Sequence, residues 1–156
     1  MKGRTPIATA PGAAREQERT VPASMAEMPA LVAFLEATLD AEACPPAITA
    51  KLMVCLDEIA SNVMRYSGAS RLTVRLSHGP APAEWQLAFI DDGTPWDPLT
   101  HADPDVTLSA EERPIGGLGL LMVKRMTDDV RYSREDGTNV LRLRISVPAT
   151  PCSPRC

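Results

Sequence analysis

A carboxylate and a carboxamide stand one helical turn apart at Glu58 and Asn62, and a cation follows at Arg65. Apolar residues recur at three- and four-residue steps from residue 46 to residue 66, which predicts a helix with one buried stripe. The three polar side chains then project from one strip beside that stripe. An amide oxygen suits Mg²⁺ as a ligand, and a neighbouring carboxylate can deprotonate a nucleophile. A solvated helix face with ordinary polar residues is the alternative, and this segment alone leaves it open.

A second segment, DDGTPWDP, combines an aspartate with a glycine turn. Large apolar residues alternate with polar or small ones from residue 84 to residue 91, which predicts a half-buried strand. Asp91 shares the parity of the apolar set, so its carboxylate is expected on the covered side of the sheet. There it can accept a hydrogen bond from an exocyclic amine such as that of adenine, while Gly93 lets backbone and ligand come close. The alternative is an ordinary surface turn.

A glycine cluster is formed by Gly116, Gly117, Leu118 and Gly119, and an apolar segment that begins LLMV follows it directly. Free backbone amides and the positive end of a helix dipole at one spot favour phosphate binding. The cluster lacks the Lys-Ser/Thr of a P-loop, and it does not follow a predicted strand as a dinucleotide fingerprint would. Taken alone, a plain loop explains it equally well.

The order and spacing of the three segments resemble the acid–amide box and the two glycine boxes of the GHKL ATPase superfamily. The likeness is greatest to the bacterial anti-sigma-factor serine/threonine kinases and runs from about residue 20 to residue 147. The stretches DDGTPWDP, ERPIGGLGLLMVKRM and REDGTNVLRLR carry it. The resemblance implies the Bergerat ATP-binding fold, an α/β fold of the α+β sandwich type. Its sheet is mixed but mainly antiparallel, with helices on one face.

Carried over residue by residue, the resemblance implies that Glu58 is the general base and that Asn62 is the Mg²⁺ ligand. Arg65 stands where related proteins often place a cation near the phosphates, and Asp91 would receive the adenine amine. The other implied ATP-binding positions are Gly93, Pro95, Gly116, Gly117, Leu118, Gly119 and Thr138. The last of these matches a threonine that supports a water in the adenine site. Pro95 departs from the superfamily pattern, which often has a second glycine there, and this affects the hinge of the lid.

The elements that must position these residues follow from periodicity and turn signals. Residues 1–18 are rich in Ala, Pro and charge, and we expect a disordered tail there. Three helices are expected, at 24–41, at 46–66 and directly after the glycine cluster. Four strands are expected, at 71–77, 84–91, 129–134 and 139–147. The clean alternation of the last strand predicts an antiparallel sheet with helices on one side only. Together they predict one ATP-binding kinase domain over residues 19–148, followed by a mobile tail over 149–156.

A long connection, residues 94–115, joins the two glycine segments. It holds four prolines and few apolar residues. Loops of this length are uncommon unless they are functional or disordered, so it is the candidate ATP lid. Arg113, near its end, is placed to meet the γ-phosphate, and a solvated arginine is the equal alternative.

Composition narrows the functional classes. A chain of 156 residues with 44% hydrophobic residues builds one core, and a net charge of -4 disfavours direct nucleic-acid binding. No apolar run approaches the roughly 20 residues that span a bilayer. The first residues lack the apolar segment of a signal peptide, so we expect a cytoplasmic protein without membrane contact.

Two functions fit these observations. The first is an ATP- and Mg²⁺-dependent serine/threonine protein kinase that transfers the γ-phosphate to a partner. By resemblance, its partners are an anti-sigma antagonist with a STAS fold and a sigma factor, and it can form a homodimer. The second is a non-catalytic module that senses ATP and sequesters a sigma factor or another regulator. Both need the same pocket, so the sequence does not separate them.

Overall fold

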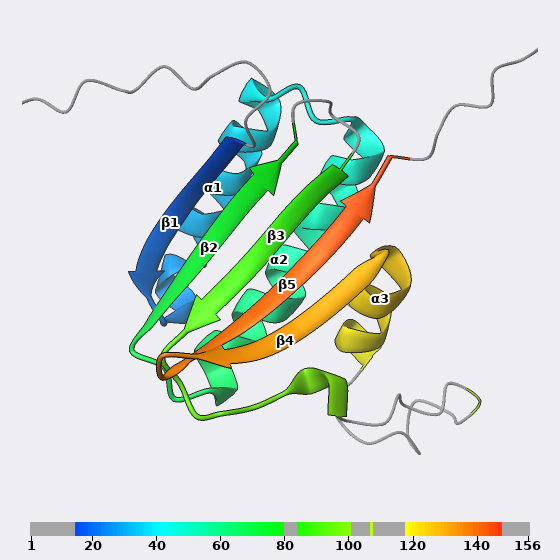
Figure 1. Cartoon of the computed structure of the whole chain (residues 1–156). Helices are drawn as coiled ribbons and strands as arrows, with labels where there is room; N and C mark the ends of the chain where they lie inside the picture. The colour runs from blue at the N-terminus through cyan, green and yellow to red at the C-terminus, as the bar shows by residue number, and fades with distance from the viewer. Residues whose placement is uncertain (1–14, 80–83, 101–106, 108–117, 148–156) are drawn as a thin grey trace, which may run out of the picture.

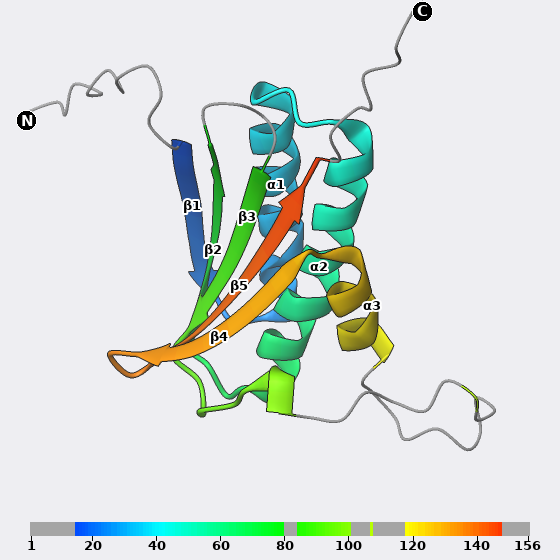
Figure 2. The same ribbon diagram turned by 45° about the vertical axis from the view of Figure 1, so that its right-hand side comes forward.

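One face of an antiparallel sheet is covered by helices in the computed structural model, which describes residues 15–79, 84–100, 107 and 118–147 (Figures 1 and 2). The five strands of this described part run in the order β1-β2-β3-β5-β4. They are β1 (Arg15–Pro22), β2 (Arg71–His78), β3 (Glu84–Asp91), β4 (Asp129–Glu135) and β5 (Thr138–Ser146). The predicted two-layer architecture is confirmed, and each pairing within the described sheet is antiparallel.

The covering layer consists of α1 (Met28–Ala41), α2 (Pro46–Tyr66) and α3 (Leu118–Met126). Two short 3₁₀ turns accompany them, η1 (Met25–Glu27) before α1 and η2 (Pro98–Thr100) after β3. The helix expected over residues 24–41 is therefore divided: Ser24 caps η1, and α1 begins with a proline in its first turn. This position suits proline because its missing N–H would have no intrahelical partner.

The predicted helix over residues 46–66 is confirmed as α2, and its apolar stripe lies in the core. Ile48, Leu52 and Ile59 are buried on it against the alternating apolar residues of β2, β3 and β5. Cys55 belongs to the same stripe, and burial raises the pKa of its thiol to about 11. An uncharged thiol in this place packs as a small apolar side chain. The buried stripe fixes the rotation of α2 about its axis and therefore the direction of its polar strip.

Strand β1 corrects the prediction of a disordered tail over residues 1–18. Residues 15–18 form the first half of this strand, and it pairs with β2 along its whole length. Its side chains are exposed except for Val21, so no apolar alternation marks it in the sequence. Backbone pairing and an ion pair between Glu18 and Arg75 at 2.8 Å hold it at the sheet edge. Charged side chains at a sheet edge also discourage pairing with other chains.

Candidate functional site

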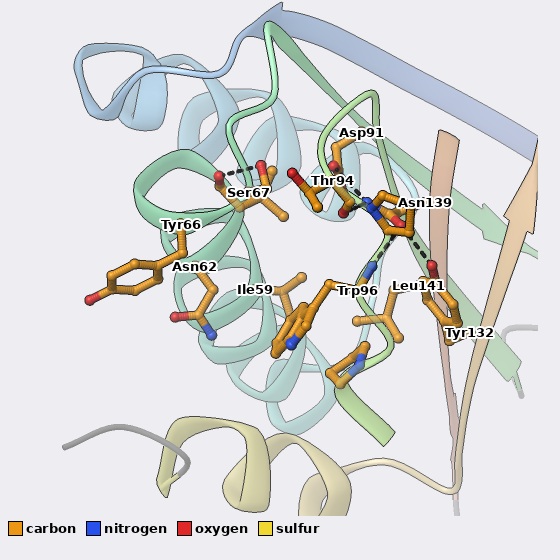
Figure 3. A pocket seen from close by; sticks show the side chains of 13 residues that line it. Ile59, Asn62, Tyr66, Ser67, Asp91, Thr94, Trp96, Tyr132, Asn139 and Leu141 are labelled. Carbon is orange, nitrogen blue, oxygen red and sulfur yellow. Dashed lines mark hydrogen bonds between the residues drawn. The ribbon is translucent and has the colours of Figure 1, made fainter. Parts of the chain in front are cut away.

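A pocket of about 470 Å³ opens where the C-terminal half of α2 meets the ends of β3 and β5 (Figure 3). Ile59 and Leu141 supply apolar walls from the helix and the sheet, and Trp96, on the segment that follows β3, also lines the pocket. Asn62 and Asp91 bring polar groups to the same space. A largely apolar cavity with a few polar groups is typical of small-molecule sites.

Asp91 occupies the closed side of the sheet, as its parity predicted, and is only 6% exposed. Its Oδ1 accepts hydrogen bonds from the Gly93 amide at 2.9 Å and from Asn139 Nδ2 at 3.1 Å. Its Oδ2 has no hydrogen-bond partner in the described part of the chain. The carboxylate therefore has one oxygen engaged by the protein and one available to a ligand.

Gly93 is fitted tightly between β3 and the end of α2. A Cβ at this position would lie 2.6 Å from the Ser67 carbonyl oxygen and 2.8 Å from Asp91 Oδ1. The next amide, from Thr94, donates to the same Ser67 carbonyl at 2.9 Å. The absence of a side chain thus lets the segment after β3 close against α2, and Asp91 is held in place by that closure.

Asp92 has a different role from its neighbour. It accepts hydrogen bonds from the Ser70 amide at 2.8 Å and the Arg71 amide at 3.1 Å, and also from the Ser70 hydroxyl. These bonds, the Ser70 hydroxyl first and the Arg71 amide second, lower the pKa of Asp92 to about 2. Both interpretations of the DDG segment are therefore present: the second aspartate organises a turn, and the first faces the pocket.

Of the acid–amide pair on α2, Asn62 lines the pocket and Glu58 does not. Asn62 lines the pocket, and its carboxamide makes no hydrogen bond within the described residues. Glu58, one turn earlier, meets α3 instead: a Cβ at Gly119 would overlap the Glu58 carboxylate. That carboxylate is also without a hydrogen-bond partner among the described residues. Two segments that are distant in the sequence thus meet at the side chain expected to be the base.

The remaining predicted positions lie in several different places. Pro95 lines the pocket, and Leu118 is 41% exposed at the first turn of α3. Arg65 is exposed on α2 and does not reach the pocket lining. Three others, Arg113, Gly116 and Gly117, lie outside the described residues, as does most of the predicted lid.

Thr138 is also absent from the pocket lining, because its hydroxyl donates to the Glu135 carbonyl in the hairpin at 2.7 Å. The next residue along β5, Asn139, lines the pocket and contacts Asp91. It was not among the positions predicted from the sequence. A signal was present, because Asn139 shares the parity of Leu141 and is therefore a polar residue on the covered face of the strand.

A Mg²⁺ ion fits the donor chemistry of this site. Asn62 offers one amide oxygen that no described residue uses, and Mg²⁺ commonly takes few protein ligands and completes its shell with water and phosphate oxygens. Three or more carboxylate, histidine or cysteine groups arranged to hold a metal by themselves are not found among the described residues. A magnesium site here would thus depend on a phosphate ligand.

No helix in the described part is long and apolar enough to cross a membrane.

Comparison with known proteins adds three findings. Residues 21–145 match the family of histidine kinase-like ATPase domains. The serine/threonine-protein kinase BtrW of Bordetella bronchiseptica is 29% identical over 98 residues, which is 59% of this chain and 66% of that protein. The structure of the RsbU and RsbW domains of Rv1364c from Mycobacterium tuberculosis superposes with a TM-score of 0.59 at 14% identity, over 85% of this chain and 32% of that chain. The chain thus spans slightly less than two thirds of the kinase and about a third of the solved chain.

Proposed function

Because the chain belongs to the histidine kinase-like ATPase domain family, we propose that its pocket binds ATP with Mg²⁺ and that the protein transfers the γ-phosphate to a serine or threonine of a protein partner. The observation that carries the proposal is how three separate segments are arranged: Asn62 on α2 and Asp91 at the end of β3 line one pocket, and Gly119 at the start of α3 lies against Glu58 of α2. We propose that each segment binds a different part of the nucleotide.

The adenine is proposed to lie between the apolar walls of the pocket. Ile59 and Leu141 match the apolar faces of a purine, while Asp91 Oδ2 accepts a hydrogen bond from the 6-amino group. The carboxylate is buried, so a base that fills the pocket without donating a hydrogen bond to it leaves an unpaired acceptor away from water. An unpaired buried acceptor is costly, and this makes the contact selective as well as attractive.

The triphosphate is proposed to extend from the adenine toward Asn62 and the start of α3. Asn62 would hold the ion, which supplies charge neutralisation at the phosphates when it is bound. The first turn of α3 lies near Glu58, and the N-terminal amides and positive dipole end of a helix favour negative groups such as phosphates. We also propose that residues 94–115 form the ATP lid and that Arg113 contacts the γ-phosphate.

Glu58 is proposed to be the general base. Its carboxylate can lie close to α3 because Gly119 has no side chain. No described residue donates a hydrogen bond to its oxygens. It is therefore available to take the proton of an incoming hydroxyl group. The related protein BtrW is named a serine/threonine-protein kinase, which supports this reaction over simple nucleotide sensing. For the partner we propose an anti-sigma antagonist with a STAS fold, with a sigma factor as a second protein partner.

The test compares Glu58→Gln with Asp57→Asn, a matched loss of charge at the exposed neighbouring carboxylate. Calorimetry with Mg·ATP should give near-normal affinity for both variants. Transfer of labelled γ-phosphate to purified STAS-fold antagonists should fall at least about 100-fold in Glu58→Gln only, because a positioned base contributes at least that factor.

Three other outcomes would correct the proposal. A wild-type protein that does not bind ATP refutes the nucleotide site. Equal transfer by wild type and Glu58→Gln removes the base from the mechanism. If the wild type binds ATP, binds a sigma factor in a nucleotide-dependent way and transfers no phosphate, the protein is a non-catalytic sensing module and not a kinase.

A further inference from the structure

We propose that Tyr66 and Trp96 form a docking surface for the protein that carries the phosphoacceptor hydroxyl group, and that Arg65 pairs with an acidic side chain of that protein. The inference rests on the proposed kinase function, because a protein acceptor has to be held over the mouth of the pocket while its hydroxyl group reacts. It also gives a role to a cation that lies outside the pocket lining.

Aromatic residues are scarce in this chain, and the exposed ones lie at one place. The sequence contains two each of Phe, Trp and Tyr. Tyr66 is 76% exposed and Trp96 is 47% exposed, whereas the others are buried or partly buried. Both exposed side chains border the pocket, although they come from different segments, the end of α2 and the stretch after β3. Exposed Tyr and Trp side chains that occur together are typical of protein–protein contact sites.

The two aromatic residues are held in a fixed relation by the backbone. The Thr94 amide donates to the Ser67 carbonyl oxygen at 2.9 Å, which joins the segment that carries Trp96 to the residue after Tyr66. The Trp96 amide also donates to Asn139 Oδ1 at 3.3 Å. Contact residues that are already in place lose little freedom when a partner binds, so more of their buried area contributes to affinity.

The direction of the Tyr66 ring favours a protein over the nucleotide as its partner. In Figure 3 the ring points away from Ile59 and Leu141, the apolar walls between which adenine is proposed to lie. Adenine between those walls would therefore leave most of the ring uncovered. A protein bound over the mouth of the pocket would cover it and remove apolar surface from water.

The position of Tyr66 on α2 suits an acceptor that reacts at Glu58. Glu58, Asn62 and Tyr66 follow one another at four-residue steps and therefore lie on successive turns. At a rise of about 1.5 Å per residue, the proposed base and Tyr66 are about 12 Å apart along the helix axis. A protein contact of ordinary size covers roughly 800 Å² on each partner and is roughly 30 Å across. One partner can thus place a hydroxyl group at Glu58 and still contact Tyr66.

Arg65 supplies the charge of this surface. It is exposed beside Tyr66 in the last turn of α2 and makes no ion pair with any described residue. Several arginines of the sheet, such as Arg75 and Arg142, pair with carboxylates instead. A partner with an acidic side chain beside its apolar contact would complete the surface at Arg65. Complementary charge of this kind speeds and orients association.

The test measures the transfer of labelled phosphate while the acceptor concentration is varied, with the purified STAS-fold antagonist that wild type phosphorylates fastest. Tyr66→Ala should raise the KM for the antagonist about 10-fold or more, as truncation of an aromatic contact residue commonly does. The kcat and the calorimetric affinity for Mg·ATP should not change, because only binding of the acceptor is lost. Tyr66→Phe keeps the ring and should retain most of the wild-type KM. Met122→Ala is the matched control, because Met122 is 43% exposed and lies outside the pocket lining.

Two further measurements address Trp96 and Arg65. Trp85 is fully buried, so Trp96 is the tryptophan that a soluble quencher can reach. With a non-hydrolysable Mg·ATP analogue already bound, a tryptophan-free form of the antagonist should shield Trp96 from acrylamide. Added salt should raise the KM for the antagonist less in Arg65→Gln than in wild type, because one attraction that salt screens is already absent. A Trp96 that stays equally accessible, or an equal salt dependence, would overturn the role of that residue.

The outcomes separate this inference from the proposed function. A wild type that transfers phosphate to no antagonist refutes the kinase proposal and this inference with it. Where wild type does transfer phosphate, an unchanged KM in Tyr66→Ala overturns the docking surface alone. If Tyr66→Ala loses affinity for Mg·ATP by the same factor as its KM rises, the ring contacts the nucleotide, and the docking surface is likewise overturned.

Discussion

Two polar networks lie at opposite ends of the same sheet, and they differ in how completely their groups are used. At the pocket end stand Asp91 and Asn139. At the far end, Glu42 accepts hydrogen bonds from Arg15 at 2.9 Å and contacts His78 Nε2 at 3.0 Å. His78 also contacts the Gly79 carbonyl through Nδ1 at 2.9 Å. Both ring nitrogens of this histidine are thus engaged within the protein.

The far network joins elements and leaves little for a ligand. Its histidine ring packs on Trp85 with a centroid distance of 4.5 Å, and Glu42 ties β1 to the end of α1. The indole nitrogen of Trp85 is buried without a hydrogen-bond partner in the described structure, but it does not line the pocket. The pocket end instead leaves Asp91 Oδ2 and the Asn62 carboxamide unused beside a cavity. Polar groups that remain unpaired at a cavity indicate function better than polar groups in general.

The largest effect is expected from Gly119→Ala. The new Cβ would overlap the Glu58 carboxylate, which is the end of a flexible side chain and can swing away. The fold should therefore survive while the base is displaced, and phosphate transfer should fall about 100-fold or more. Transfer assays beside thermal unfolding measure the two effects separately. Met122→Ala, at an exposed position of the same helix, is the control. A Gly119→Ala protein with full transfer activity would show that Glu58 is not the base.

Local periodicity predicted much of the fold. The buried stripe of α2 and the parity of β3 placed Asn62 and Asp91 correctly, because both depend only on the period of one element. The family resemblance, based on three short segments, is confirmed by the match over residues 21–145. Strand β1 was missed because it is almost wholly exposed and is defined by its partner β2.

The contacts between elements were harder to predict. Asn139 faces Asp91 because the register of β3 with β5 pairs these two residues, and register depends on turns and packing outside either strand. Thr138 was chosen from a motif, although the hairpin uses its hydroxyl for the Glu135 carbonyl. The approach of Gly119 to Glu58 likewise required the tertiary structure. The residue types were visible in the sequence, but their partners were not.

A smaller effect, on stability alone, is expected from Glu42→Gln. The change keeps size but removes the charge that pairs with Arg15 and contacts His78. Because the Arg15 side chain is 64% exposed, solvent screens that pair, and we expect a loss of about 0.5–1 kcal/mol in the free energy of unfolding. ATP affinity should not change. Urea unfolding and calorimetry give both values, with the exposed Glu36→Gln on α1 as the control. A marked loss of ATP affinity would mean that the two ends of the sheet are coupled.

The smallest effect concerns acid stability and distinguishes Asp92 from its neighbour in the pocket. Hydrogen bonds from Ser70 and Arg71 lower the pKa of Asp92 from 3.8 to about 2. A carboxyl group with a lowered pKa in the folded state stabilises the protein above its unfolded pKa, and this contribution is lost as the pH falls from about 4 to about 2. Wild type should therefore melt slightly above Asp92→Asn at pH 7, and the difference should shrink across that range. ATP affinity at pH 7 should be retained, because Asp92 does not line the pocket. A difference in melting temperature that is constant down to pH 2 would show that its charge does not stabilise the turn.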